Sequence, residues 1–248
     1  MQKITFLGTA SAVPDANHQN SHFVIEGGGR VVLVDCPGNP FVRLNLAKID
    51  PLTITDLILT HFHPDHVSGL PLFLMNLWLM KRKTPLAICG LAVVLDKSKK
   101  LMALYDWEDW DNLYPINFID IPNKEGSQVL DTKGIQILTS PARHLIPSIG
   151  IKICFPEGSI CYSGDTAPCE EIVRLAEGCN ILIHEATGEE GGHSSPGAAG
   201  EIAQIAGVQK LYLIHYPYDS DPQVLLKEAK ANFTGDVFVA EDLMTIEI

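Results

Sequence analysis

The sequence lacks any stretch that would cross a membrane, direct export or divide the chain into parts. Its longest apolar run, from Leu70 to Met80, contains Asn76 and is too short to span a bilayer. The N-terminus passes from Met1-Gln2-Lys3 into a predicted strand, without the charged leader and apolar core of a signal peptide. We find no linker rich in glycine, serine or proline and no internal repeat. We therefore expect one soluble, cytoplasmic domain covering residues 1–248.

Paired cysteines are also lacking. The six cysteines contain no C-x-x-C spacing, and most lie in apolar runs, where a free cysteine packs as a small hydrophobic side chain. This usage is typical of a reducing compartment such as the cytoplasm. The cysteines are Cys36, Cys89, Cys154, Cys161, Cys169 and Cys179.

Positive charge is scarce. The chain has 18 lysines and arginines against 30 acids, and its formal net charge of −12 repels nucleic acid and anionic membranes on average. One segment departs from this average, because residues 81–100 contain six basic residues and a single acid, Asp96. We interpret the cluster as solvated helix ends, with a local phosphate-binding patch as the alternative. It consists of Lys81, Arg82, Lys83, Lys97, Lys99 and Lys100.

The most informative stretch is Thr60-His61-Phe62-His63-Pro64-Asp65-His66, which follows the apolar run Leu57-Ile58-Leu59. Three imidazoles and a carboxylate at the end of a predicted buried strand favour zinc, manganese or iron over calcium or magnesium. In an extended segment His61 and His63 point the same way, whereas Asp65 and His66 fall in the following turn. The pattern therefore predicts two metal ions side by side. A helix start capped by Asp65 is the simpler alternative.

Hydrophobic periodicity predicts mixed α and β structure. The segments His22 to Glu26 and Arg30 to Asp35, on either side of three glycines, predict an antiparallel hairpin. The segment Leu70 to Met80 is apolar almost all round, which is typical of a deeply buried helix or of a subunit interface. Other helices are predicted at Pro40 to Lys48, Leu91 to Tyr105 and from Pro196. Other strands are predicted at Lys3 to Gly8, Asp56 to Thr60, Pro85 to Cys89, Asn117 to Ile121, Ile135 to Ser140, Ile149 to Phe155, Ser159 to Ser163, Asn180 to His184 and Leu211 to His215.

The motif His-x-His-x-Asp-His after an apolar strand resembles the metallo-β-lactamase superfamily, and further motifs resemble its ribonuclease Z branch. The resemblance implies an α/β (α+β) fold, a four-layered αββα sandwich with a dinuclear metal site at one edge of the two sheets. It also implies a homodimer, with the helix Leu70 to Met80 at the interface. The further motifs are Phe6-Leu7-Gly8-Thr9-Ala10-Ser11, Val34-Asp35-Cys36-Pro37-Gly38, Ser68-Gly69-Leu70-Pro71, His144-x-x-Pro147-x-x-Gly150, Ser163-Gly164-Asp165-Thr166, His184-Glu185-Ala186-Thr187 and His193-Ser194-Ser195.

By motif position, the resemblance implies one ion held by three histidines, a second held by an aspartate and two histidines, and an aspartate that bridges them. Zinc is the expected metal, with manganese or iron as the alternatives. In this order, the ligands are His61, His63 and His144; Asp65, His66 and His215; and Asp165.

Two ions about 3.5 to 4 Å apart lower the pKa of a shared water and stabilise both oxygens of an in-line displacement, which matches a phosphodiester. Asp65 is expected to orient or deprotonate that water, and His193 to protonate the leaving oxygen. Glu185 is expected to orient His193 through a hydrogen bond. A place beside the capping residues of the next helix is the alternative for His193.

Neighbouring residues receive supporting roles. Asp35, Thr166 and Thr187 are expected to hold ligands in place, and His184 to be a satisfied buried imidazole. For the acidic and aromatic stretch around Trp107 and Trp110 we expect a solvated face with anchoring indoles, and substrate stacking is the alternative.

The sequence departs from the ribonuclease Z branch in one respect that affects the substrate. Only twenty residues separate His144 from Asp165, where the transfer-RNA-trimming members carry a long basic arm. We therefore expect a phosphodiesterase acting on small or cyclic phosphodiesters. The alternatives are transfer-RNA 3′ processing, with RNA as the partner, a thioester or lactone hydrolase, and a non-catalytic, metal-stabilised interaction module.

Overall fold

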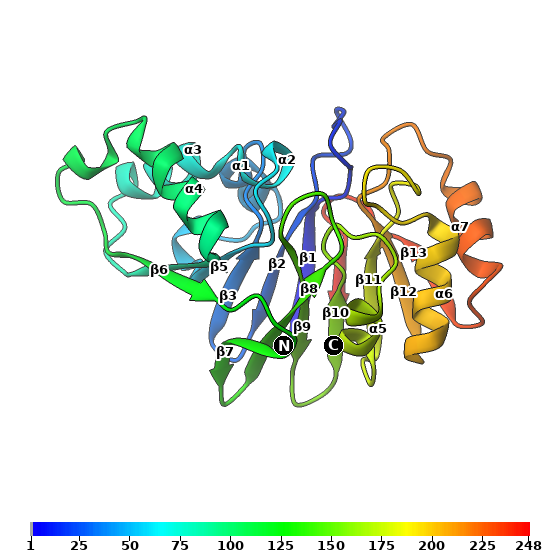
Figure 1. The fold of residues 1–248 in the computed structure, drawn as a ribbon. Coiled ribbons are helices and arrows are strands. Elements are labelled where there is room, and N and C mark those ends of the chain that lie inside the picture. Colours follow the sequence, from blue (N-terminus) through cyan, green and yellow to red (C-terminus); the bar gives the residue numbers. More distant parts are fainter. Residues whose placement is uncertain (1) are drawn as a thin grey trace.

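The computed structural model of the chain describes residues 2–248 and contains two seven-stranded sheets that pack face to face. Helices cover the outer face of each sheet, so the molecule has four layers in the order helix, sheet, sheet, helix (Figure 1). The four-layered αββα sandwich expected from the resemblance is therefore confirmed.

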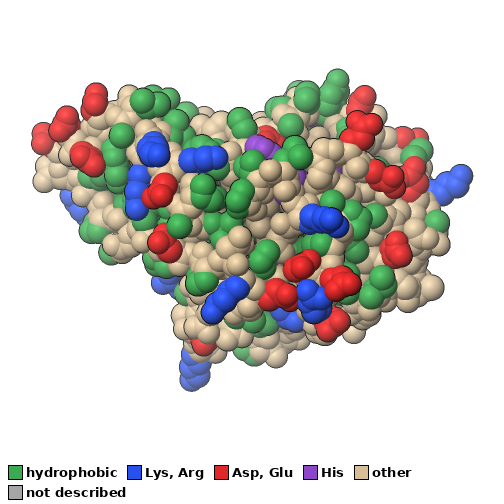
Figure 2. Space-filling view, viewed as in Figure 1, with side chains coloured by type: hydrophobic (Ala, Val, Ile, Leu, Met, Phe, Trp, Pro, Cys, Tyr) green, Lys and Arg blue, Asp and Glu red, His purple; other side chains and the backbone are tan. Residues whose placement is uncertain are grey.

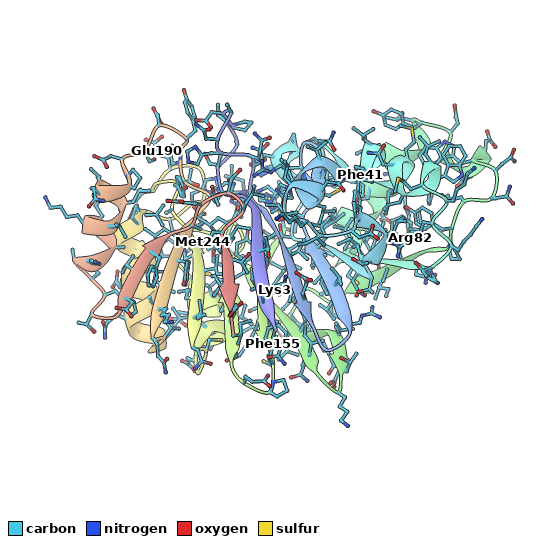
Figure 3. The ribbon with its side chains drawn as sticks, turned by 180° about the vertical axis from the view of Figure 1, so that it is seen from behind. Lys3, Phe41, Arg82, Phe155, Glu190 and Met244 are labelled. Atoms are coloured by element: carbon cyan, nitrogen blue, oxygen red, sulfur yellow. The ribbon has the colours of Figure 1, made fainter. Side chains whose placement is uncertain are left out.

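The first sheet has the strand order β14-β1-β2-β3-β4-β5-β6. Strands β1 to β3 are antiparallel neighbours, and β3 to β6 run parallel to one another. Figure 3 shows this sheet from behind, with Lys3 on β1 and Met244 just before β14. The strands are β1 Lys3–Gly8, β2 His22–Gly27, β3 Arg30–Val34, β4 Asp56–Leu59, β5 Leu86–Leu91, β6 Ile116–Ile121 and β14 Thr245–Glu247.

The second sheet has the order β13-β12-β11-β10-β9-β8-β7. Strands β7 to β10 are antiparallel neighbours, whereas β10 to β13 run parallel. The strands are β7 Ser127–Thr132, β8 Ile135–Ala142, β9 Ser148–Cys154, β10 Ser159–Tyr162, β11 Ile181–Glu185, β12 Lys210–Ile214 and β13 Asp236–Val239.

The helices divide between the two outer faces. Helices α1 and α4 pack on the first sheet, with α3 in contact with both of them, and α5, α6 and α7 pack on the second sheet. Within residues 2–248 no helix is both long and apolar enough to cross a bilayer. The helices are α1 Pro40–Leu46, α2 Pro64–Val67, α3 Leu70–Leu79, α4 Ala92–Ala103, α5 Glu170–Ala176, α6 Pro196–Ala206 and α7 Pro222–Lys230, with 3₁₀ turns η1 Pro51–Thr53 and η2 Trp107–Asp109.

Strand periodicity explains how each sheet is buried on both faces. Along β11, Ile181 and Ile183 enter the core between the sheets, whereas Leu182 packs under the helices of the second sheet. Strands β10, β11 and β12 end at the same edge of the sandwich (Figure 1). The end of β4 lies there too, because His61 and His66 after β4 meet Asp165 after β10. In α/β sheets this carboxyl-terminal edge is where ligands bind.

The predicted strands and helices lie close to their predicted positions, including the hairpin β2–β3. Five elements have no counterpart in the prediction: β7, β13, β14, α5 and α7. Strand β7 is half-exposed and polar, and β14 has only three residues, so neither carries an apolar pattern strong enough to predict it.

Candidate metal centre

The segment after β4 delivers four donor side chains to the carboxyl-terminal edge. The chain remains extended to His63, which precedes the short helix α2, and Pro64 occupies the first helical turn. His61 is fully buried, whereas His63 and Asp65 are partly open to solvent. This arrangement separates His61 and His63 from Asp65 and His66, as the spacing predicted.

Three histidines form the first donor cluster. The Nδ1 atom of His63 lies 3.1 Å from Nε2 of His61 and 3.1 Å from Nε2 of His144. An ion bound at a zinc–nitrogen distance of about 2.0–2.1 Å sets its ligand nitrogens roughly 3.1–3.4 Å apart. The three imidazoles therefore fit a single metal ion.

The second donor cluster consists of Asp65, His66, His215 and Asp165. The Nε2 atoms of His66 and His215 lie 3.4 Å apart, and Oδ2 of Asp65 lies 3.5 and 3.4 Å from them. Burial alone would raise the pKa of Asp65, but the hydrogen bond with His215 and the charges of His66 and His215 lower it. The Asp65 carboxylate is thus ionised and suited to a cation.

Asp165 lies between the two clusters. Its Oδ2 atom is 3.3 Å from Nε2 of His66, 3.4 Å from that of His215 and 3.7 Å from that of His61. Its Oδ1 atom is buried and has no hydrogen-bond partner among the described residues. A carboxylate with one oxygen beside imidazoles of both clusters and the other without a partner fits a bridge between two ions.

Hydrogen bonds at Nδ1 fix the rings of four histidines. The Thr60 hydroxyl lies 3.1 Å from Nδ1 of His61 and 2.9 Å from Asp35, so the histidine donates to the hydroxyl and the hydroxyl to the carboxylate. Asp35 accepts directly from Nδ1 of His66 at 2.7 Å. Each bond leaves the Nε2 atom free to face an ion, as outer partners do in metal sites.

The other two rings are held by the loop that follows β11 (Figure 1). Nδ1 of His215 donates to the Thr187 hydroxyl at 2.8 Å, and the hydroxyl donates to the His215 carbonyl at 2.6 Å. Nδ1 of His144 donates to the carbonyl of Gly192 at 2.9 Å. One short loop therefore orients one ligand in each cluster.

One supporting residue and one donor adopt a backbone conformation that is rare outside glycine. Asp35 has a φ of 61° and His215 a φ of 54°, and each directly follows a strand. Such conformations carry strain and concentrate at functional sites. Nothing in the residue types alone would have predicted this strain.

The Glu185 carboxylate is fully buried and lies 2.8 Å from Nδ1 of His193. It also accepts the backbone N–H groups of Thr166 and Thr187. Glu185 is the last residue of β11, whereas the sequence placed it just after the strand. The predicted contact with His193 is therefore present, although its catalytic role remains a proposal.

His193 lies above both clusters. Its ring makes an edge contact with His144 at 4.8 Å between centroids and stacks on His215 at 5.6 Å. Burial alone would lower its pKa, but the hydrogen bond and charge of Glu185 raise it. His193 therefore holds its proton more tightly than an ordinary histidine.

The structure changes the interpretation of several other residues. Arg82 is buried and donates to backbone carbonyls, including those of Ile54 and Pro85, so it belongs neither to a solvated helix end nor to a phosphate-binding patch. The Thr166 hydroxyl donates to the Ala167 carbonyl rather than holding a ligand. His184 is buried as predicted, but only its Nδ1 atom is hydrogen-bonded.

The indoles of the acidic stretch are partly buried against the core as anchors. Trp110 stacks on Trp78 at 5.1 Å between ring centroids, and Trp107 meets the ring of Phe118 edge-on. These contacts favour the anchoring interpretation over substrate stacking.

Thr60 and Gly192 are the supporting residues that the sequence analysis missed. Thr60 precedes His61 in the motif itself, so its position beside the ligands was available as a signal. Gly192 precedes His193 in the pair Gly191-Gly192, but only the folded structure shows its contact with His144.

Comparisons with known proteins cover the whole chain. The sequence profile of the family described as "Anti-Pycsar protein Apyc1" matches residues 2–237. Ribonuclease Z of Methanothermobacter thermautotrophicus is 30% identical over 305 aligned residues, which cover 100% of this chain and 97% of that protein.

Two solved structures are similar along their full length. The metallo-β-lactamase fold protein YhfI of Bacillus subtilis has a TM-score of 0.86 at 22% identity and covers 100% of this chain and 99% of its own. The short form of human tRNase Z, ELAC1, has a TM-score of 0.83 at 25% identity and covers 99% of both chains.

Proposed function

The chain belongs to the family described as anti-Pycsar protein Apyc1 and to the ribonuclease Z-like hydrolases of the metallo-β-lactamase fold, and from this premise we propose a phosphodiesterase with two divalent metal ions. The broader statement, that it is a metal-dependent hydrolase, follows from these relatives. The observation that carries the finer proposal is the pair of donor clusters joined by the Asp165 carboxylate.

The proposed ligands are the seven side chains of the two clusters. When bound, two ions lower the pKa of a shared water and stabilise charge on both oxygens of an in-line displacement. Because the pKa of Asp65 is lowered, this carboxylate accepts a hydrogen bond from the attacking water and orients it. His193, whose pKa is raised, donates its Nε2 proton to the leaving oxygen while Glu185 accepts from Nδ1.

The short connection between β9 and β10 and the negative net charge support small or cyclic phosphodiesters as substrates. Strands β9 and β10 are joined by residues 155–158 alone, where the transfer-RNA-trimming branch has its arm. The alignment with the archaeal relative spans 305 positions against 248 residues here, so more than fifty positions of that protein have no counterpart. The net charge of −12 further disfavours a large polyanion.

Transfer-RNA 3′ processing is the second candidate, and the comparisons favour it over the small substrate. The curated relative is named Ribonuclease Z, and a solved neighbour is a human tRNase Z. Arg82 is buried, so in the first half of the basic cluster Lys81 and Lys83 are the cations exposed for binding RNA. Charge reversal at these two lysines without effect on precursor cleavage would exclude such a grip.

The first experiment measures hydrolysis of bis(p-nitrophenyl) phosphate by metal-loaded protein. We expect turnover to be lost in His66→Ala and reduced by roughly 10² to 10⁴ in His193→Ala, the usual contribution of a general acid. His193→Ala should retain both ions, which metal analysis checks. Absence of turnover with two ions bound would exclude the phosphodiesterase and favour a thioester or lactone hydrolase.

The substrate class is decided by comparing kcat/KM for a cyclic nucleoside monophosphate and for a transfer-RNA precursor. Cleavage of the precursor alone, falling steeply with salt, would establish the second candidate. Zinc as the metal is part of the proposal and is tested by metal analysis of the purified protein. A single tightly held ion, unaffected by Asp65→Ala, would instead indicate a non-catalytic, metal-stabilised module.

The assembly and location are also proposals. We propose that residues 1–248 form one domain and that two copies form a homodimer through α3 and the adjacent α1, which expose Leu72, Leu79, Met80, Val42 and Leu46. The six cysteines are free within the described residues, which supports a cytoplasmic location.

A further inference from the structure

A shallow cavity of about 370 Å³ opens beside the loop that carries His144. The start of α4, the end of β6 and the following loop form its other walls. Its lining is mainly apolar, with Val93, Ile121 and Pro147 among the lining residues. The polar residues among those that line it are Asn123 and Asp120. None of these residues belongs to the two donor clusters.

The cavity lies next to the cluster of three histidines. Pro147 follows His144 by three residues, which limits their separation to about 10 Å. Phe62 stands between His61 and His63 in the sequence. The ammonium group of Lys97 on α4 lies 5.6 Å from the centre of the Phe62 ring.

Val93 and Lys97 share one face of α4, because residues four apart on a helix are neighbours. This face therefore extends from the cavity, which Val93 lines, to the ring of Phe62, the residue between His61 and His63 in the sequence. In Figure 2, lysine or arginine side chains are visible on the α4 side of the exposed histidines. On the α4 side, an anionic substrate bound at the metal centre would lie near the Lys97 ammonium group and then near the apolar cavity.

We propose that the cavity binds the base of a nucleotide phosphodiester whose phosphate is held at the metal centre, with Lys97 beside the phosphate. A nucleobase is a flat ring system with polar edges, and it lies one sugar away from its phosphate. The apolar walls suit its faces, and the Asn123 amide, which both donates and accepts, suits its edges. The Asp120 carboxylate accepts from a ring N–H, as in thymine, or from an exocyclic amino group.

This inference rests on the proposed phosphodiesterase function but is independent of substrate size. A cyclic nucleotide and the end of an RNA both place a base next to the scissile phosphate. The cavity would therefore determine which base is preferred in either substrate class.

The test compares thymidine 5′-(p-nitrophenyl) phosphate, which carries a base, with bis(p-nitrophenyl) phosphate, which carries none. Val93→Trp fills the cavity at a position that is 42% exposed, so the fold should tolerate it. We expect the ratio of the two kcat/KM values to fall about tenfold or more, the usual scale of base stacking. The matched control is Val224→Trp, at a 48% exposed valine on α7, and it should keep the ratio.

A binding measurement separates this inference from the proposed function. Calorimetric titration compares thymidine 5′-monophosphate with ribose 5-phosphate, first for the wild type and then for Val93→Trp and Asn123→Ala. Tighter binding of the nucleotide, lost in both variants, supports the cavity even if neither ester is hydrolysed. Equal binding of the two ligands, or a nucleotide preference that survives Val93→Trp, overturns it whatever the activity.

Discussion

At the scale of single residues, the metal centre depends on oxygen atoms that accept hydrogen bonds from the Nδ1 atoms of its histidines. The hydroxyls of Thr60 and Thr187 each accept from one ring and donate onward, to Asp35 and to the His215 carbonyl. A hydroxyl used in both directions fixes the tautomer of the ring. The geometry of both clusters therefore depends on residues that are not themselves ligands.

We expect Thr187→Val to weaken binding of the ion in the cluster of Asp65, His66 and His215 by roughly 10- to 100-fold. Valine keeps the shape of threonine but cannot accept the His215 Nδ1–H. Calorimetric metal titration measures the change, and Thr234→Val, at an exposed threonine far along the chain, is the control. Unchanged affinity in Thr187→Val would show that the hydroxyl does not orient the ring.

Glu185→Gln tests the pairing with His193 through its pH dependence. The neighbouring carboxylate raises the pKa of His193, so the protonated acid persists to higher pH than in an ordinary histidine, and kcat falls as pH rises through that raised pKa. Removing the negative charge lowers the pKa, and the alkaline limb of the pH profile should move to lower pH. A limb that stays in place, with metal content unchanged, would assign it to another group.

The seven donors could be predicted because a short motif concentrates four of them and apolar strands lead to the others. The residues that orient them follow no local pattern. Gly192 contacts a histidine 48 positions away, and Asp35 contacts one 31 positions away. These contacts exist only after β3, β4 and β11 have been brought to one edge of the sandwich.

At the scale of elements, the loop between β11 and α6 connects His193, the proposed acid, to His144, a proposed metal ligand. Gly192 supplies the carbonyl that holds His144, and the next residue is His193. Gly192 has a φ of 78°, and a Cβ atom there would lie 3.3 Å from Nδ1 of His144. Displacing this loop therefore disturbs the acid and a ligand together.

Gly192→Ala should lower the free energy of unfolding by about 1 kcal/mol or more, because the left-handed backbone is strained for alanine. It should also weaken metal binding, because the new methyl group presses on His144. Gly207→Ala is a matched control, since Gly207 has a φ of 70° but nothing within 4 Å of its added Cβ. Both variants should lose stability, and only Gly192→Ala should lose metal affinity. Equal metal affinity in the two variants would contradict this coupling.

Strands with clear apolar patterns were predictable one by one, including the edge strand β6, whereas the other edge strands, β7, β13 and β14, were not. Strands β13 and β14 have four and three residues, and each is defined by pairing with β12 or β1. Such short segments gain their structure from a distant partner rather than from their own periodicity.

At the scale of the whole molecule, the apolar surface of α1 and α3 is the feature that a second copy would cover. We expect Leu79→Glu, at a 57% exposed position, to yield a monomer with unchanged thermal stability. Ile205→Glu, at a 63% exposed position on α6 of the other outer layer, should leave the dimer intact. Light scattering after size-exclusion chromatography measures both masses, and a monomeric wild type would rule out this interface.

The pairing of β14 with β1 sets the order in which the first sheet is completed. Lys3 pairs with Glu247, so the two strands are separated by most of the chain, and the termini lie near one another in Figure 1. At the usual speed of synthesis, about 5 to 20 residues per second, β1 waits roughly ten to fifty seconds on the ribosome before β14 exists. During that interval its outer edge is open to other strands, so newly made chains should need protection by chaperones that the finished enzyme does not.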